Sequence, residues 1–122
     1  MLNGRTALII EEEFLIALDI QRMLETLGVG QTLFARTAGE ADELRARWPE
    51  IALAVVEVHR DDTTSLDLGE GRGAAGIPVV LVTADVALRH GFAPALDLPL
   101  VLKPVPEETL TAAVGQALAT RS

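Results

Sequence analysis

The sequence predicts an α/β domain in which a five-stranded parallel sheet carries helices on both faces. Two observations favour this fold. Short apolar runs alternate along the chain with segments that repeat their apolar residues at helical spacing. The apolar runs also lack the polar residue at every second position that a half-exposed strand shows, which is typical of strands buried on both faces. A chain of 122 residues has room for one hydrophobic core, so we expect one domain over residues 1–122.

The expected strands are short and rich in valine, leucine and isoleucine. They cover residues 7–10, 32–35, 51–56, 78–82 and 98–102. The second of them is the weakest, and it follows a glycine-rich turn. Because parallel strands need a crossover connection, we expect a helix between each strand and the next.

The first expected helix covers residues 13–27. Its apolar residues form one stripe at helical spacing: Ile16, Ile20, Met23, Leu24 and Leu27. Gly28 follows the stripe, and glycine is a common residue in the left-handed conformation that ends a helix. The sequence therefore predicts a helix that ends at Gly28.

Two further helices have recognisable first turns. Thr37 and Glu40 have the spacing of a capping box, and we expect this helix to run to about Trp48, where Pro49 ends it. Pro106 opens the last helix, with acidic residues next to it in the first turn. The expected buried side of that last helix is Leu110, Val114, Ala117 and Leu118.

The third and fourth helices are expected to be weakened. Residues 65–75 contain three glycines, each of which costs about 1 kcal/mol relative to alanine in a helix. Gly91 and Pro94 interrupt the segment between Asp85 and Leu98.

Composition excludes several classes of protein. A formal net charge of -8 repels nucleic acid and anionic lipid, so we expect neither as a partner. The chain has no cysteine, which excludes disulfides and thiolate metal sites. Neither a secretory signal nor an apolar run of the roughly 20 residues that span a membrane is present. We therefore expect a cytoplasmic protein.

Acids, a hydroxyl and a lysine follow the expected strands. Glu11 and Glu12 come after the first strand, Glu57 after the third, Thr83 after the fourth and Lys103 after the fifth. Each residue alone has an ordinary explanation as a helix cap or a solvated side chain. Together they converge on one edge, because the carboxyl ends of parallel strands lie on the same side of a sheet, where such folds place their sites.

This combination resembles the receiver domain of two-component response regulators. The likeness rests on IIEEEFLIALDIQRMLETLG, LAVVEVH, IPVVLVTAD and VLKPV, which together span most of the chain. The resemblance implies a flavodoxin-like doubly wound fold with strand order 2-1-3-4-5. It also implies a role in two-component signal transduction or a phosphorelay.

The resemblance assigns a role to each residue at the edge. In receivers an acid pair binds Mg²⁺, and Glu11 and Glu12 match that pair. A hydroxyl residue and a lysine bind the phosphoryl group, and Thr83 and Lys103 match them. Glu57 stands where receivers carry the aspartate that accepts the phosphate. With glutamate at this position, the resemblance implies a degenerate receiver, or pseudo-receiver.

Glutamate at position 57 predicts that phosphate is not accepted there. Its side chain is one methylene longer than aspartate and fills the space of the phosphoryl group, while Mg²⁺ tolerates little deviation from octahedral geometry. Glu57 either imitates the phosphorylated state or pairs with Lys103 and locks the site. We favour the lock, because Leu100 stands where receivers commonly carry a switching aromatic residue. The chain is then not an enzyme but a phosphorylation-independent interaction module.

Partners and cofactors follow from this interpretation. No cofactor is expected apart from weakly bound Mg²⁺ at Glu11 and Glu12. The partner is a protein, either a histidine kinase or another regulator, and a homodimer is the alternative. Phe14, Leu15 and Leu18 point away from the apolar stripe of the first helix. They form either an interaction surface or a site covered by loops.

Two other functions stay open. A genuine phosphorelay receiver that accepts phosphate from a histidine kinase would gain mass on treatment with acetyl phosphate. A flavin- or nucleotide-binding protein of the same fold would need a phosphate-binding loop after the first strand. The acidic run of residues 11–13 repels phosphate and disfavours that function.

Overall fold

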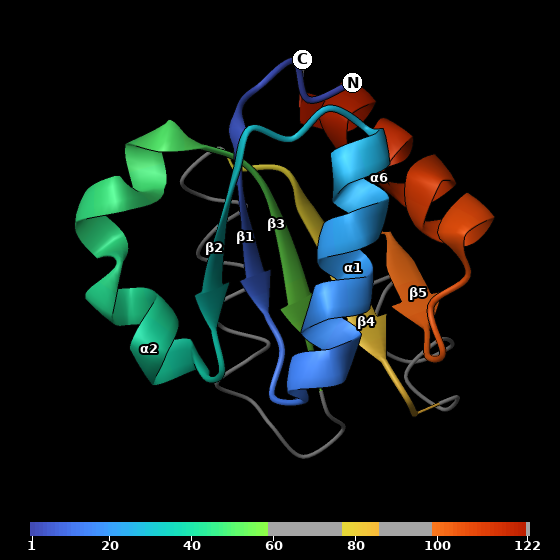
Figure 1. Cartoon of the computed structure of the whole chain (residues 1–122), viewed down its shortest axis with the longest axis horizontal. Coiled ribbons are helices and arrows are strands. Elements are labelled where there is room, and N and C mark those ends of the chain that lie inside the picture. The colour runs from blue at the N-terminus through green and yellow to red at the C-terminus, as the bar shows by residue number, and fades with distance from the viewer. Residues whose placement is uncertain (59–76, 86–98, 122) are drawn as a thin grey trace.

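The computed structural model describes residues 1–58, 77–85 and 99–121, which form a five-stranded parallel sheet with helices against it (Figure 1). The strands are β1 (Thr6–Ile10), β2 (Gln31–Ala35), β3 (Ile51–Glu57), β4 (Val79–Thr83) and β5 (Leu100–Leu102). Their order in the sheet is β2-β1-β3-β4-β5, and each neighbouring pair is parallel. The predicted flavodoxin-like class and strand order are confirmed.

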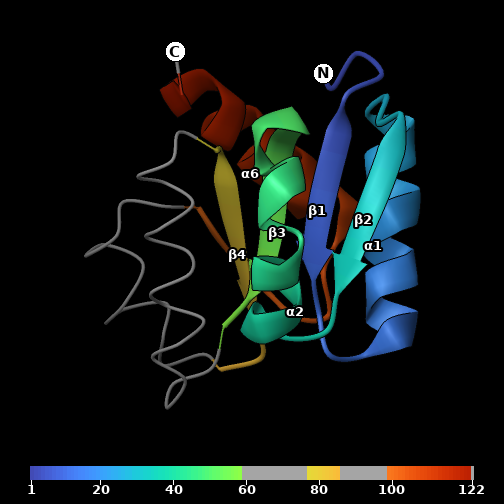
Figure 2. The same cartoon turned by 90° about the vertical axis from the view of Figure 1, so that its left-hand side faces the viewer.

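Helices pack on both faces of the sheet. The described helices are α1 (Phe14–Thr26), α2 (Ala38–Glu43), the 3₁₀ helix η1 (Arg45–Glu50) and α6 (Glu107–Arg121). Helices α1 and α6 cover one face, and Figure 2 shows α1 and α2 on different sides of β1 and β2. The predicted third and fourth helices lie outside the described residues.

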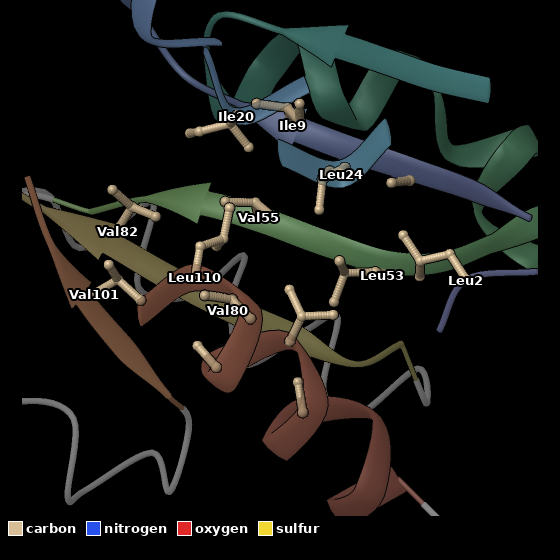
Figure 3. Packing of buried hydrophobic residues seen from close by; sticks show 14 of the residues in the cluster. Leu2, Ile9, Ile20, Leu24, Leu53, Val55, Val80, Val82, Val101 and Leu110 are labelled. Carbon is tan, nitrogen blue, oxygen red and sulfur yellow. The ribbon is translucent and has the colours of Figure 1, made fainter. Parts of the chain in front are cut away.

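The sheet separates two apolar clusters. In the first, α1 and α6 pack on β3 and β4, and Figure 3 shows Leu110 of α6 beside Val55 and Val80. The second cluster joins the other face of the sheet to α2 and η1 through Ala41 and Trp48. All the residues of β4 are buried, as the unbroken apolar runs predicted.

Helix α1 forms as its periodicity predicted. Ala17, Ile20 and Leu24 are buried in the first cluster, and the remaining residues of the apolar stripe pack against it. Gly28 has φ +90°, a left-handed conformation that L side chains rarely adopt, and its amide donates to the carbonyl of Glu25. The predicted glycine cap is confirmed.

The helix after β2 differs from the prediction. Thr37 caps it as expected, accepting a hydrogen bond of 3.2 Å from the amide of Glu40. The expectation of one helix to about Trp48 is wrong, because α2 ends at Glu43 and η1 follows with Pro49 inside it. The Trp48 indole donates to the carbonyl of Ala41 at 3.2 Å. The same carbonyl accepts the amide of Leu44 at 3.0 Å, an i→i+3 bond of the tighter 3₁₀ type.

No helix in the described part of the chain is long and apolar enough to cross a membrane.

Candidate functional site

The carboxyl ends of β1, β3 and β5 bring three charged residues together. Ile10 is paired with Val56 in the sheet register, so Glu11 and Glu57 leave neighbouring strands at the same level. Lys103 follows the last residue of β5 and reaches toward both acids. Glu11, Glu57 and Lys103, which the sequence placed at one edge, are therefore in contact.

Lys103 is the centre of the cluster. Its ammonium nitrogen Nζ bonds to Oε2 of Glu57 and lies 2.9 Å and 3.1 Å from the two carboxylate oxygens of Glu11. A third acid, Glu13, places an oxygen 3.7 Å from the same nitrogen. The side chain of Lys103 is 7% exposed, that of Glu11 1% and that of Glu57 8%. The ion pairs are thus largely shielded from water, which strengthens the attraction between the charges.

The two buried carboxylates also hold the backbone that leads into α1. Oε1 of Glu57 accepts a hydrogen bond of 3.2 Å from the amide of Glu12, and Oε2 of Glu11 accepts one of 3.0 Å from the amide of Glu13. The amide of Glu11 itself donates to the carbonyl of Ala35 at 3.0 Å. The loop between β1 and α1 is therefore held by side chains of the site.

Burial and charge shift the pKa values of two groups. Removal from water raises the pKa of Glu11, and the nearby charge of Glu57 adds to the rise, against the opposing hydrogen bond from the Glu13 amide and the contact with Lys103. Burial alone would lower the pKa of Lys103. The hydrogen bonds to Glu57 and Glu11 outweigh that effect and raise its pKa above the ordinary lysine value. The site thus holds its proton on the lysine.

Thr83 lies at the same edge, and its hydroxyl is bonded within the turn that directly follows β4. The hydroxyl oxygen accepts a hydrogen bond of 3.1 Å from the amide of Asp85, and the residue is 1% exposed. Its carbonyl accepts a bond of 2.8 Å from the amide of Lys103, which fixes where the lysine leaves β5. Thr83 therefore positions the backbone of Lys103.

Sequence reasoning did not place Glu13 at the site. Glu13 is the N-cap residue of α1 without a side-chain cap hydrogen bond, and its carboxylate turns toward Lys103 instead. Glu12, expected in the acid pair, is exposed and contributes its backbone amide to Glu57. The signal for Glu13 was present as the third acid of an unbroken run.

The predicted interaction surface is partly exposed. Phe14 is 69% exposed and Leu15 is 76% exposed, whereas Leu18 is half-buried. Both exposed residues belong to the first turn of α1, directly after the loop that the site holds.

The resemblance to receivers implies a divalent cation, and the donors at the site suit one. Oxygens of Glu11, Glu13 and Glu57 lie within 4.8 Å of one another. Oε1 of Glu11 is buried and has the Lys103 ammonium 2.9 Å away, a charge contact that does not meet hydrogen-bond geometry. Carboxylate oxygens are the ligands of Mg²⁺ and Ca²⁺. A bound cation would neutralise these acids, and it would compete with Lys103 for the same oxygens.

Solved structures resemble the chain over almost its whole length. The receiver domain of the PhyR response regulator from Erythrobacter litoralis is 29% identical, with a TM-score of 0.75 over 96% of this chain and 92% of that one. A CheY-like receiver domain protein from Methanospirillum hungatei is 22% identical, with a TM-score of 0.74 over 96% and 95%.

Another similar structure belongs to a longer protein. The anti-anti-sigma factor PhyR from Bartonella quintana is 29% identical, with a TM-score of 0.76 over 97% of this chain, which spans 50% of its length. No protein-family model and no curated protein matches the chain. The strand order, the acids and lysine at the carboxyl edge and these similarities agree, and the chain has the fold of response-regulator receiver domains and resembles them over almost its whole length.

Proposed function

We propose that this receiver domain acts as a phosphorylation-independent protein-interaction module in which Glu57 and Lys103 lock the phosphate site. The fold and the receiver structures that it resembles support a role in response-regulator signalling. Phosphorylation independence rests on the hydrogen bonds of the Glu57 carboxylate.

Both carboxylate oxygens of Glu57 are engaged. Oε2 bonds to the Lys103 ammonium, and Oε1 accepts the amide of Glu12. Formation of an acyl phosphate needs a carboxylate oxygen in line with the incoming phosphorus and a cation that neutralises charge between the two. At Glu57 the cation that would assist the transfer is already bonded to the would-be nucleophile. This ion pair is the observation that carries the proposal.

Two considerations support a lock rather than an imitation of the phosphorylated state. Leu100 replaces the switching aromatic residue and packs against the cluster beneath α2. A carboxylate also carries less charge than a phosphate, about -1 against -1.5 to -2. Glu57 therefore keeps the domain in a single, locked state.

The domain then acts in the cytoplasm through contacts with proteins and not through catalysis. The similar PhyR protein from Bartonella quintana is described as an anti-anti-sigma factor. A histidine kinase or another regulator fits the receiver fold as partner, and a second copy of the chain is the alternative. Binding rather than group transfer is the activity that a locked site leaves.

Incubation with acetyl phosphate and Mg²⁺, followed by intact-mass analysis, tests the proposal. We expect no gain of phosphate on the wild-type chain under conditions that phosphorylate a receiver with aspartate at the acceptor position. A mass gain of one phosphate that disappears in Glu57→Gln would show that Glu57 accepts it and would refute the lock.

A further inference from the structure

We propose that a second copy of the chain pairs with the open side of β2 in the antiparallel direction, so that two sheets join into one. We call the side of β2 that faces away from β1 the β2 edge. The proposal goes beyond the proposed function, because it states how the chain associates with itself. It does not depend on the ion pair between Glu57 and Lys103.

The two outer strands of the sheet differ in how well they resist pairing. Sheet edges usually avoid it through short strands, proline or charged side chains. The outer strand β5 has three residues and is flanked by Pro99 and Pro104. The outer strand β2, which Figure 2 shows beside β1, has five residues and contains neither proline nor a charged residue. The β2 edge is therefore open to another strand.

Thr32 and Phe34 supply the main-chain groups of the β2 edge. The carbonyl of Ala35 accepts the amide of Glu11 from the β1 side, so Ala35 faces β1. Main-chain groups alternate between the two sides of a strand, which turns those of Leu33 toward β1 and those of Thr32 and Phe34 toward the open side. A partner at the β2 edge must offer amides and carbonyls at the same alternate spacing.

The β2 edge is complementary to itself. In an antiparallel pair centred on Leu33, Thr32 of each copy lies opposite Phe34 of the other, and the two residues exchange both main-chain hydrogen bonds. The side chains of Thr32 and Phe34 share one face of the strand; Thr32 is half-buried and Phe34 is 41% exposed. Leu33, which packs against the cluster beneath α2, meets its own copy on the other face. Each exposed phenylalanine thus gains a small neighbour that covers it, as the symmetry of a dimer requires.

Charge does not oppose this contact, although the whole chain carries a net charge of -8. Since β2 has no charged residue, no like charges stand opposite one another along the pair. Arg47, which donates to the side chain of Gln31 at 3.0 Å, is paired with Glu50. A neutral strip offers no charge that would select a partner of different sequence, whereas its pattern of side chains matches a second copy.

Sedimentation of the full chain over a range of concentrations tests the proposal. We expect a monomer–dimer equilibrium that Phe34→Lys weakens about tenfold or more, because it places a charge in the covered contact. Phe14→Lys is the matched control, since it adds the same charge at another exposed phenylalanine, and it should change the equilibrium less than about twofold. Urea denaturation verifies that both variants fold.

A charge pair tests the register of the two strands. Because Thr32 of one copy lies opposite Phe34 of the other, Thr32→Glu combined with Phe34→Lys places opposite charges across the dimer twice. We expect the combined variant to dimerise at least about threefold more tightly than Phe34→Lys alone.

Amide hydrogen exchange tests the edge without any substitution. The amides of Thr32 and Phe34 become hydrogen-bonded in the dimer, whereas those of Leu33 and Ala35 face β1 in monomer and dimer alike. We expect exchange at Thr32 and Phe34 to slow about tenfold or more as the chain dimerises, with little change at Leu33 and Ala35.

The alternatives give different results. A chain that sediments as a monomer even at millimolar concentration overturns the proposal and leaves the locked site standing. A dimer that Phe14→Lys dissociates and Phe34→Lys leaves intact places the contact on α1, against the proposal. A monomer whose Thr32 and Phe34 amides are protected by an added peptide of alternating valine and threonine assigns the β2 edge to a strand of a partner protein, also against it. Dimerisation through Phe34 that appears only after treatment with acetyl phosphate and Mg²⁺ would refute phosphorylation independence and keep the β2 edge.

Discussion

Glu57 at the end of β3 and Lys103 after β5 form an ion pair across the carboxyl edge of the sheet, and each side chain is less than one-tenth exposed. Because β4 separates β3 from β5 in the sheet, the pair spans an intervening strand. The same carboxylate holds the amide of Glu12 through its other oxygen. The pair therefore connects the segments that follow β1, β3 and β5 at the carboxyl edge of the sheet.

The two partners of this ion pair should differ in their contribution to stability. Lys103→Met leaves Glu11 and Glu57 as neighbouring buried charges without their cation, and we expect a loss of about 3–5 kcal/mol in the free energy of unfolding. Glu57→Ala leaves Lys103 paired with Glu11 and Glu13, so about 1–2 kcal/mol should be lost. Urea denaturation at neutral pH measures both. A larger loss in Glu57→Ala than in Lys103→Met would contradict the arrangement.

Stability should fall at high pH in a way that depends on Lys103. Its pKa is raised in the folded protein, so the folded state binds this proton more tightly than the unfolded chain. The extra stability is fully present below the ordinary lysine pKa of 10.5 and is lost as pH rises above that value through the folded pKa. Comparing urea denaturation at pH values on either side of 10.5 measures the loss. In Lys103→Met this loss of stability at high pH should be absent. Identical pH profiles of stability in the wild type and in Lys103→Met would exclude a contribution from Lys103.

Removal of Lys103 should strengthen the binding of divalent cations. The ammonium contacts the same carboxylate oxygens that a cation would use, so Mg²⁺ must compete with it. In calorimetric titrations we expect weak binding at millimolar Mg²⁺ in the wild type and about tenfold tighter binding in Lys103→Met. The control is Glu11→Gln in the Lys103→Met background, which should weaken Mg²⁺ binding again. The absence of heat in all three proteins would remove the metal site.

Glu57 should protect the backbone amide of Glu12 from hydrogen exchange, but not the amide of Glu13. The amide of Glu12 is bonded to Glu57, whereas the amide of Glu13 is bonded to Glu11. In Glu57→Ala we expect amide hydrogen exchange at Glu12 to quicken about tenfold or more, and exchange at Glu13 to change little. NMR detection resolves both amides in one experiment. Equal acceleration at the two positions would indicate general loosening instead of a lost hydrogen bond.

Much of the fold could be predicted because its signals are local. Strands buried on both faces are continuous apolar runs, and Gly28 and Thr37 end and begin helices through their own backbone and side-chain chemistry. The break between α2 and η1 could not be predicted in this way. At this break the Trp48 indole donates to the carbonyl of Ala41, a contact between residues seven positions apart that capping and periodicity patterns do not include.

The sequence predicted which strand ends supply the candidate site, but not which acids of the first loop turn toward Lys103. Parallel strands bring their carboxyl ends to one edge, so Glu11, Glu57 and Lys103 could be placed together from the order of the strands. Which acid of the run 11–13 turns inward depends on where β1 ends and on the first turn of α1. The resemblance to receivers assigned Glu12 to the acid pair, whereas the folded loop turns the carboxylate of Glu13 toward Lys103.

The proposed lock depends on the bond between the Lys103 ammonium and the Glu57 carboxylate. ¹⁵N NMR of the lysine side chains tests it most directly, because an ammonium held by carboxylates and shielded from water exchanges its protons slowly. We predict one slowly exchanging ammonium signal at neutral pH, assigned by its loss in Lys103→Met and moved by Glu57→Ala. A Lys103 signal that exchanges as fast as that of an exposed lysine, and that Glu57→Ala leaves unmoved, would contradict the account.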